Sequence, residues 1–163
     1  RLLRAYALLS RERRIDFGLV VTGSRGRADR AVRQTAAQLD LENQVRLLGW
    51  IDRGDMPALY AHARCLIFPT LYEGFGLPLI EAFASGTPAA VSDIPPLREV
   101  AGGAARFFNP FSVEDIAAAL EDVSGNETLR ARLAALGSER AGHYTMERAI
   151  QAALDAYERL LLR

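Results

Sequence analysis

Lysine is absent from this sequence, and every one of its 20 basic side chains is an arginine. The arginines are balanced by 20 aspartates and glutamates, so the formal net charge at pH 7 is zero. No stripe of basic residues alternates with aromatic residues along the chain. Nucleic acid is therefore not expected as a partner, because nucleic-acid-binding domains carry such a basic surface.

Cysteine and histidine are scarce, which restricts the redox and metal chemistry of the chain. The single cysteine, Cys65, rules out an internal disulfide and a cysteine-based zinc cluster. It lies within an apolar run, which predicts a buried thiol in the core. The two histidines, His62 and His143, have no partner at the spacing of metal ligands, and no Asp-x-Asp motif occurs. Neither a metal nor a cofactor is expected.

Long hydrophobic runs are missing as well. No apolar stretch approaches the roughly 20 residues that a membrane-spanning helix needs, and the N-terminus does not read as a secretory signal peptide. We therefore expect a cytoplasmic location and no transmembrane segment. Half of the 163 residues are nevertheless apolar, which is sufficient for one domain with a substantial core.

What the sequence does contain is a regular alternation of short apolar runs and amphipathic segments. The apolar runs predict buried strands at 16–23, 44–50, 64–70, 87–93 and 104–110. The segments with helical periodicity predict helices at 1–14, 27–41, 54–63, 78–85, 95–102, 112–124, 127–142 and 145–162.

This alternation is typical of the α/β class, in which an open parallel sheet is covered by helices on both faces. The right-handed crossover rule favours a doubly wound, Rossmann-like fold, with residues 1–163 as one domain. The chain opens on a helix, whereas a doubly wound domain usually opens on a strand. We therefore expect a sheet that lacks its first strand.

The segment LYEGFGLPLIEAFASG, residues 71–86, is the candidate for a functional site. It follows the expected strand 64–70, and in open parallel sheets ligands bind beyond the carboxyl ends of the strands. Gly74 and Gly76 allow close approach of the backbone, and Pro78 suits the first turn of the next helix. The amides at such a helix N-terminus favour a phosphate group.

Two carboxylates flank this anion site. Glu81 lies about one turn into the helix and leans toward its N-terminus, so it can accept hydrogen bonds from a vicinal diol such as that of ribose. Glu73 lies in the loop itself. Together these groups match the parts of a nucleotide diphosphate linked to a sugar. Alternatively, both glutamates only complement the dipole of the helix.

The complete string of residues resembles the signature of retaining GT-B glycosyltransferases of the family 4 type. That signature is Glu-x7-Glu, and here it reads EGFGLPLIE from Glu73 to Glu81, with Gly-Thr-Pro after the helix. The flanking segments VRLLGWID, CLIFPT and IPPLREVAGGAARFFNP are also similar to segments of the family. The resemblance extends over nearly the whole chain, but it covers only the C-terminal half of such an enzyme.

The resemblance also implies a role for each part of the site. It implies that Glu73 contacts the donor sugar near the reacting centre, as the catalytic residue of this half, and that Glu81 binds the ribose hydroxyls. Backbone groups would hold the diphosphate and contact the edge of the base. These donor-binding positions are Gly74, Phe75, Gly76 and Leu77 for the diphosphate, and Trp50 or Ile51 for the base.

One departure from the family pattern concerns the diphosphate. The family uses an arginine and a lysine just before the first helix of this domain, whereas this chain begins at that helix and has no lysine. The N-terminal GT-B domain, which binds the acceptor, is absent too. We therefore expect a donor-binding half that does not turn over by itself. The arginines of GSRGR, residues 23–27, are expected in an exposed loop rather than at a phosphate.

The function implied by the resemblance is transfer of a hexose from a nucleotide-diphosphate sugar to a glycan or lipid-linked acceptor in polysaccharide biosynthesis. GDP-mannose is the first candidate for the donor. No metal is implied, because backbone dipoles and basic side chains stabilise the leaving diphosphate. The full-length protein is expected in the cytoplasm or at the inner membrane as a peripheral protein. Two alternatives stay open: a non-catalytic nucleotide-binding or regulatory module, and a sugar-nucleotide epimerase.

The last expected helix carries a long apolar stripe. Its members are Ile150, Ala153, Leu154, Tyr157, Leu160 and Leu161. Such a stripe could join two copies of the chain, but we expect it to pack on the sheet of its own domain.

Overall fold

The computed structural model describes residues 1–12, 15–23 and 27–161, without the side chains of Arg27 and Ala28. Most of the arginine-rich segment 23–27 therefore lies outside the described residues. The prediction that its arginines are exposed falls on those residues as well. The strands are β1 Leu19–Thr22, β2 Val45–Gly49, β3 Leu66–Phe68, β4 Ala89–Ser92 and β5 Ala105–Phe108. The helices are α1 Leu2–Arg11, α2 Arg27–Gln38, α3 Met56–His62, α4 Leu77–Ala84, α5 Pro95–Ala101, α6 Val113–Gly125, α7 Glu127–Ala141 and α8 Met146–Leu161.

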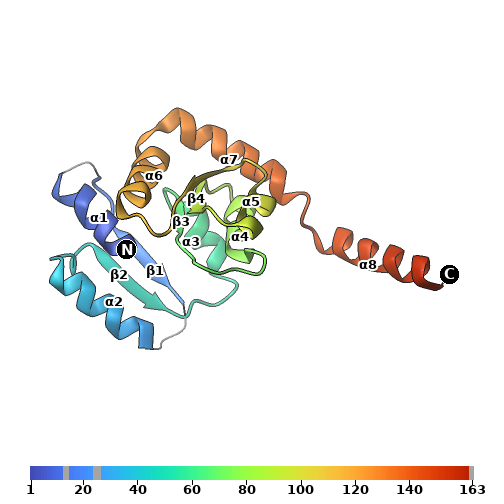
Figure 1. Ribbon diagram of the computed structural model, residues 1–163, viewed down its shortest axis with the longest axis horizontal. Helices are drawn as coiled ribbons and strands as arrows, with labels where there is room; N and C mark the ends of the chain where they lie inside the picture. The colour runs from blue at the N-terminus through green and yellow to red at the C-terminus, as the bar shows by residue number, and fades with distance from the viewer. Residues whose placement is uncertain (13–14, 24–26, 162–163) are drawn as a thin grey trace.

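The α/β class predicted from the alternation of elements is confirmed. Each expected helix and strand is present in the expected order (Figure 1). The strands are shorter than the apolar runs that predicted them, because each run also includes residues that lead into and out of the ladder. All strand pairs are parallel, as the crossover helices require.

The parallel strands form two hydrogen-bonded sheets rather than a single ladder. β1 pairs with β2 in one sheet, and the other has the order β3-β4-β5. In the 3-2-1-4-5-6 order of doubly wound folds, β2 and β1 take positions 3 and 2, and β3 to β5 take positions 4 to 6. Position 1, between β1 and β3, holds no strand among the described residues. The two ladders thus agree with the expectation that the first strand is lacking.

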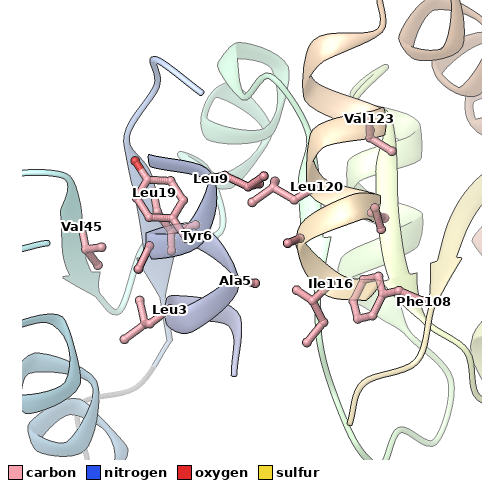
Figure 2. Packing of buried hydrophobic residues seen from close by; sticks show 14 of the residues in the cluster. Leu3, Ala5, Tyr6, Leu9, Leu19, Val45, Phe108, Ile116, Leu120 and Val123 are labelled. Carbon is pink, nitrogen blue, oxygen red and sulfur yellow. The ribbon is translucent and has the colours of Figure 1, made fainter. Parts of the chain in front are cut away.

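Helix α1 packs against α6, and residues of both helices belong to the larger of the two hydrophobic cores in the described part of the chain. Figure 2 shows Ala5 and Leu9 of α1 facing Ile116 and Leu120 of α6. The same cluster includes Leu19 and Val45 from the first sheet and Ala90 and Phe108 from the second. One apolar core therefore joins the two sheets, although no hydrogen-bonded ladder among the described residues does so.

A second core holds α4, the helix that carries Glu81. Leu79 and Phe83 of α4 are fully buried against Val91 of β4 and Leu97 of α5. Helix α7 crosses α4 so closely that a Cβ atom on Gly137 would lie 2.5 Å from Cδ1 of Phe83. Helix α4 is thus clamped on its apolar side, whereas Glu81 on the same helix is exposed.

Helix α8 departs from the sequence-based expectation. It extends away from the rest of the molecule (red in Figure 1), and none of its described residues is buried. In its apolar stripe, Leu154 is 51% exposed and Tyr157 is 67% exposed. The expected packing on the domain's own sheet was wrong. In the sheet β3-β4-β5, the central strand β4 is already covered on both faces and offers α8 no free apolar surface. No helix in the described part of the chain is long and apolar enough to cross a membrane.

Candidate functional site

The candidate site is built on the loop that follows β3 and on the start of α4. Gly76 takes the N-cap position of α4 with φ 106° and ψ 43°, a left-handed conformation that side chains rarely adopt. A Cβ atom at Gly76 would also lie 2.7 Å from Cδ2 of the buried Leu97. Pro78 falls in the first turn, as predicted. Glycine and proline therefore fix the angle at which the loop enters the helix.

Glu73 folds back onto the amides of its own loop. Its Oε1 atom accepts hydrogen bonds from the amide of Gly74 at 3.0 Å and from that of Phe75 at 3.4 Å. Among the described residues, the amides of Gly76 and Leu77 have no acceptor. The loop and the first turn of α4 thus present several N–H groups to one region, and a carboxylate already occupies part of it.

Phe75 is held by a residue that sequence reasoning missed. Its ring meets the ring of Tyr144 edge to face, with centroids 5.6 Å apart and an interplanar angle of 80°. Tyr144 in turn accepts a hydrogen bond from Arg140 at 3.0 Å. The side chain of Arg140 also donates to the carbonyl groups of Glu99 and Val100 at 2.6 and 2.8 Å. The turn between α7 and α8 therefore supports the tip of the site loop.

Glu81 is exposed on α4, and among the described residues its carboxylate has one side-chain partner. The hydroxyl group of Tyr60, on α3, donates a hydrogen bond to Oε2 of Glu81 at 3.2 Å. Burial and the negative charge of Glu81 raise the pKa of Tyr60 above its ordinary value, so the phenol stays protonated. Sequence patterns did not reveal this contact, because the two residues lie on different helices and 21 positions apart.

Trp50 and Ile51 follow the carboxyl end of β2, in the other sheet. Trp50 is 70% exposed, which is unusual for so large an apolar side chain. Among the described residues, no hydrogen bond or ring contact links Trp50 or Ile51 to the Glu73–Glu81 segment. The structure therefore brings six of the eight predicted site residues together in one loop and helix and leaves these two on a separate loop.

The remaining residues that sequence analysis singled out are not part of this site. Cys65 packs against the larger core and is partly buried, which raises the pKa of its thiol to about 11. His62 Nδ1 lies 2.8 Å from the carbonyl oxygen of Ala58, and His143 contacts Arg148 at 3.2 Å. The described residues include no cluster of three or more side chains suited to a metal.

Comparison with known proteins gives the family. The sequence model described as "Glycosyl transferases group 1" matches residues 1–140. The chain belongs to the group 1 glycosyl transferases. Among its curated relatives in this family is the O-antigen chain mannosyltransferase B of Escherichia coli, which is 36% identical over 163 residues. That alignment covers 98% of this chain and 42% of the relative, so this group 1 domain spans less than half the length of such a protein.

Solved structures confirm the fold of this group 1 glycosyl transferase domain. A glycosyltransferase from Rickettsia africae superposes with a TM-score of 0.88 at 19% identity, covering 98% of this chain and 43% of that one. The C-terminal domain of a glycosyl transferase group 1 family protein (LpcC) from Francisella tularensis superposes with a TM-score of 0.73 at 24% identity, covering 86% and 75%. The fold is that of the C-terminal half of GT-B glycosyltransferases, as the sequence motif predicted.

Proposed function

We propose that this domain binds the nucleotide-diphosphate sugar of a retaining hexosyltransferase and that the donor is GDP-mannose. The observation that carries the proposal is that Glu73 and Glu81 lie before and after two amides at the start of α4, those of Gly76 and Leu77, which have no acceptor among the described residues. The sequence similarity to a mannosyltransferase supports mannose as the sugar.

The diphosphate is proposed to bind at the loop amides and the N-terminus of α4. A phosphate there accepts hydrogen bonds from Gly76 and Leu77 and is stabilised by the positive end of the helix dipole. In this structure, the amides of Gly74 and Phe75 donate hydrogen bonds to Glu73 instead. A carboxylate bound to backbone amides marks a position where a negatively charged oxygen is well solvated by the protein. On donor binding, Glu73 releases these amides to the phosphate.

The two carboxylates then contact the two sugar rings of the donor, which lie on either side of the diphosphate. Glu81, one turn into α4, accepts hydrogen bonds from the vicinal hydroxyl groups of the ribose. Glu73, released from the loop amides, contacts the sugar near its anomeric carbon. Trp50 and Ile51 contact the base, for which the exposed indole of Trp50 offers an apolar surface.

The proposed reaction breaks the bond between the anomeric carbon and the diphosphate oxygen. The oxygen of the acceptor hydroxyl forms the new bond to the anomeric carbon on the same face that the diphosphate leaves, so the anomeric configuration is retained. The proton of that hydroxyl passes to the departing diphosphate oxygen. The loop amides and the helix dipole stabilise the negative charge that develops on the leaving group, and no metal is needed for this. The acceptor is a glycan or a lipid-linked sugar, bound by a further domain in a protein as long as the relatives. The 163-residue chain therefore binds the donor without transferring the sugar.

Calorimetric titration with GDP, UDP and ADP tests the proposal. The chain should bind one of the three, with GDP expected, and Glu81→Ala should abolish or strongly weaken that binding. Glu158→Ala is the matched control, because Glu158 is an equally exposed glutamate on α8. Loss in the Glu81 variant with full binding in the control supports a nucleotide site at α4.

Two results would contradict the proposal. If none of the three nucleotides binds, this domain does not contain a nucleotide-binding site. If Glu81→Ala and Glu158→Ala bind the nucleotide as tightly as the unaltered chain, the site lies elsewhere. The two alternative functions share the nucleotide cleft, so they are distinguished by assaying mannose transfer with the full-length protein.

A further inference from the structure

The hydroxyl group of Tyr60 reaches the proposed site from α3, the helix that packs against α4. Only 8% of Tyr60 is exposed, so the core of the domain holds its ring. Its hydroxyl oxygen nevertheless lies 3.2 Å from Oε2 of the exposed Glu81. A rigid, buried donor is thus attached to the end of a flexible, exposed acceptor. No local feature of α3 requires this hydrogen bond, because it stabilises neither end of that helix.

The backbone of Tyr60 is fixed as well. Thr87, which is 2% exposed, donates a hydrogen bond from its Oγ1 atom to the carbonyl oxygen of Tyr60 at 2.7 Å. Thr87 lies just beyond the C-terminal end of α4, the helix that carries Glu81. Helices α3 and α4 also pack against each other. The hydroxyl of Tyr60 and the backbone of Glu81 are therefore parts of one rigid unit.

The hydrogen bond leaves the carboxylate able to bind further hydroxyl groups. An ionised carboxylate has about four lone-pair positions on its two oxygens, and Tyr60 uses one of them. Oε1 and the second position on Oε2 can still accept from two neighbouring hydroxyls. A free glutamate side chain on a helix surface has several rotatable bonds, and ordering them costs conformational entropy when a ligand binds. Tyr60 has ordered this side chain before the ligand arrives.

We propose that Tyr60 is a positioning residue, which holds the Glu81 carboxylate in place for the vicinal diol of the nucleotide ribose. This inference rests on the proposed function, because it concerns the same site. Tyr60 acts through Glu81 and does not itself contact the nucleotide. Its effect should therefore depend on the ribose hydroxyls and should be absent for a nucleotide that lacks them.

The experiment compares Tyr60→Phe with the unaltered chain against two probes. The probes are GDP and 2′,3′-dideoxy-GDP, or the corresponding pair of UDP or ADP if one of those binds instead. Phenylalanine keeps the buried ring and removes only the hydroxyl, so the variant should unfold at nearly the same temperature. Tyr157→Phe, on an exposed face of α8, is the matched control.

Tyr60→Phe should weaken GDP binding about fivefold to tenfold, which lies in the range of an ordinary single hydrogen bond, because Glu81 is exposed to water. Binding of the dideoxy form should be unchanged, and Tyr157→Phe should match the unaltered chain with both probes. In Glu81→Gln, adding Tyr60→Phe should have a smaller effect than it has alone, because the two residues act together.

Each contrary outcome has a distinct meaning. Equal losses with GDP and its dideoxy form would show that Tyr60 only supports the fold of the site and would overturn the inference. Unchanged GDP affinity in Tyr60→Phe overturns it as well. A chain that binds GDP and dideoxy-GDP equally well shows that Glu81 does not contact the diol. A chain that binds no nucleotide at all overturns the proposed function and, with it, the role of Tyr60.

Discussion

Gly76 is the position at which a single methyl group should most clearly disturb the site. Gly76→Ala should destabilise the domain for two separate reasons, the backbone conformation at this position and a steric clash of the new Cβ atom. The backbone at φ 106° is left-handed, which costs a non-glycine residue about 1–2 kcal/mol. The Cβ atom also lies 2.7 Å from Cδ2 of Leu97, which has no exposed surface and must shift within a packed core.

The expected cost follows from these two contributions. Overpacking of a core by one methyl group typically costs about 1–3 kcal/mol. Replacement of glycine by alanine recovers about 0.4–1 kcal/mol, because it restricts the unfolded chain. The net loss in the free energy of unfolding is therefore about 3 kcal/mol, within a range of about 1–5 kcal/mol. For a domain of this size, a loss of about 3 kcal/mol lowers the melting temperature by about 6–12 °C.

Gly74→Ala provides a control in the same loop. Nothing lies within 4 Å of a Cβ atom built on Gly74, and its φ is outside the left-handed range. Urea denaturation should give this variant the stability of the unaltered chain or slightly more, by up to about 1 kcal/mol. If Gly76→Ala and Gly74→Ala unfold at the same urea concentration, the reasoning about the N-cap of α4 is wrong.

Four further predictions follow from the same structure. Gly137→Ala should lower the free energy of unfolding in urea by about 1–3 kcal/mol, because its Cβ atom would lie 2.5 Å from the buried Phe83 ring. The control Gly125→Ala should be neutral, because nothing lies within 4 Å of a Cβ atom there. Ending the chain after Thr145 should change the melting temperature by less than about 2 °C, because no residue of α8 is buried; a larger drop would contradict the exposed position of that helix. Alkylation of Cys65 in the folded chain should still accelerate above pH 10, because burial raises the thiol pKa to about 11, whereas in the unfolded chain the rate should level off near the ordinary value of 9.0. Glu73→Gln should bind a nucleoside diphosphate about two- to fivefold more tightly in calorimetry, because the uncharged glutamine side chain releases the N–H groups of the loop more readily. Weaker binding would show that Glu73 does not compete with the phosphate.

The order of the elements was predictable from the sequence because it depends on local periodicity. The apolar runs at 16–23 and 44–50, for example, contain the strands β1 and β2, and the segments with 3.6-residue spacing became helices. The site loop was equally local, since Gly76 and Pro78 determine how the chain enters α4 whatever else surrounds it. The motif from Glu73 to Glu81 was therefore accessible from a contiguous string of residues.

The partners of the site residues were not predictable in this way. Tyr60 and Tyr144 reach Glu81 and Phe75 from α3 and from the turn after α7. Their sequence neighbourhoods show only ordinary helical spacing, and nothing in them specifies which segment lies across the contact. Such pairs arise when helices pack around a sheet, and this packing depends on the whole core.

By itself, the sequence determined the α/β class, the succession of strands and helices, and the loop on which the two glutamates lie. Short-range forces set these features: the burial of apolar runs, the limited φ of proline and the freedom of glycine. Only the tertiary structure decided that the strands form two sheets and that α8 extends from the domain with its apolar stripe exposed. Amphipathic periodicity shows that a helix has an apolar face, but whether that face is covered depends on the surfaces that the rest of the fold leaves free.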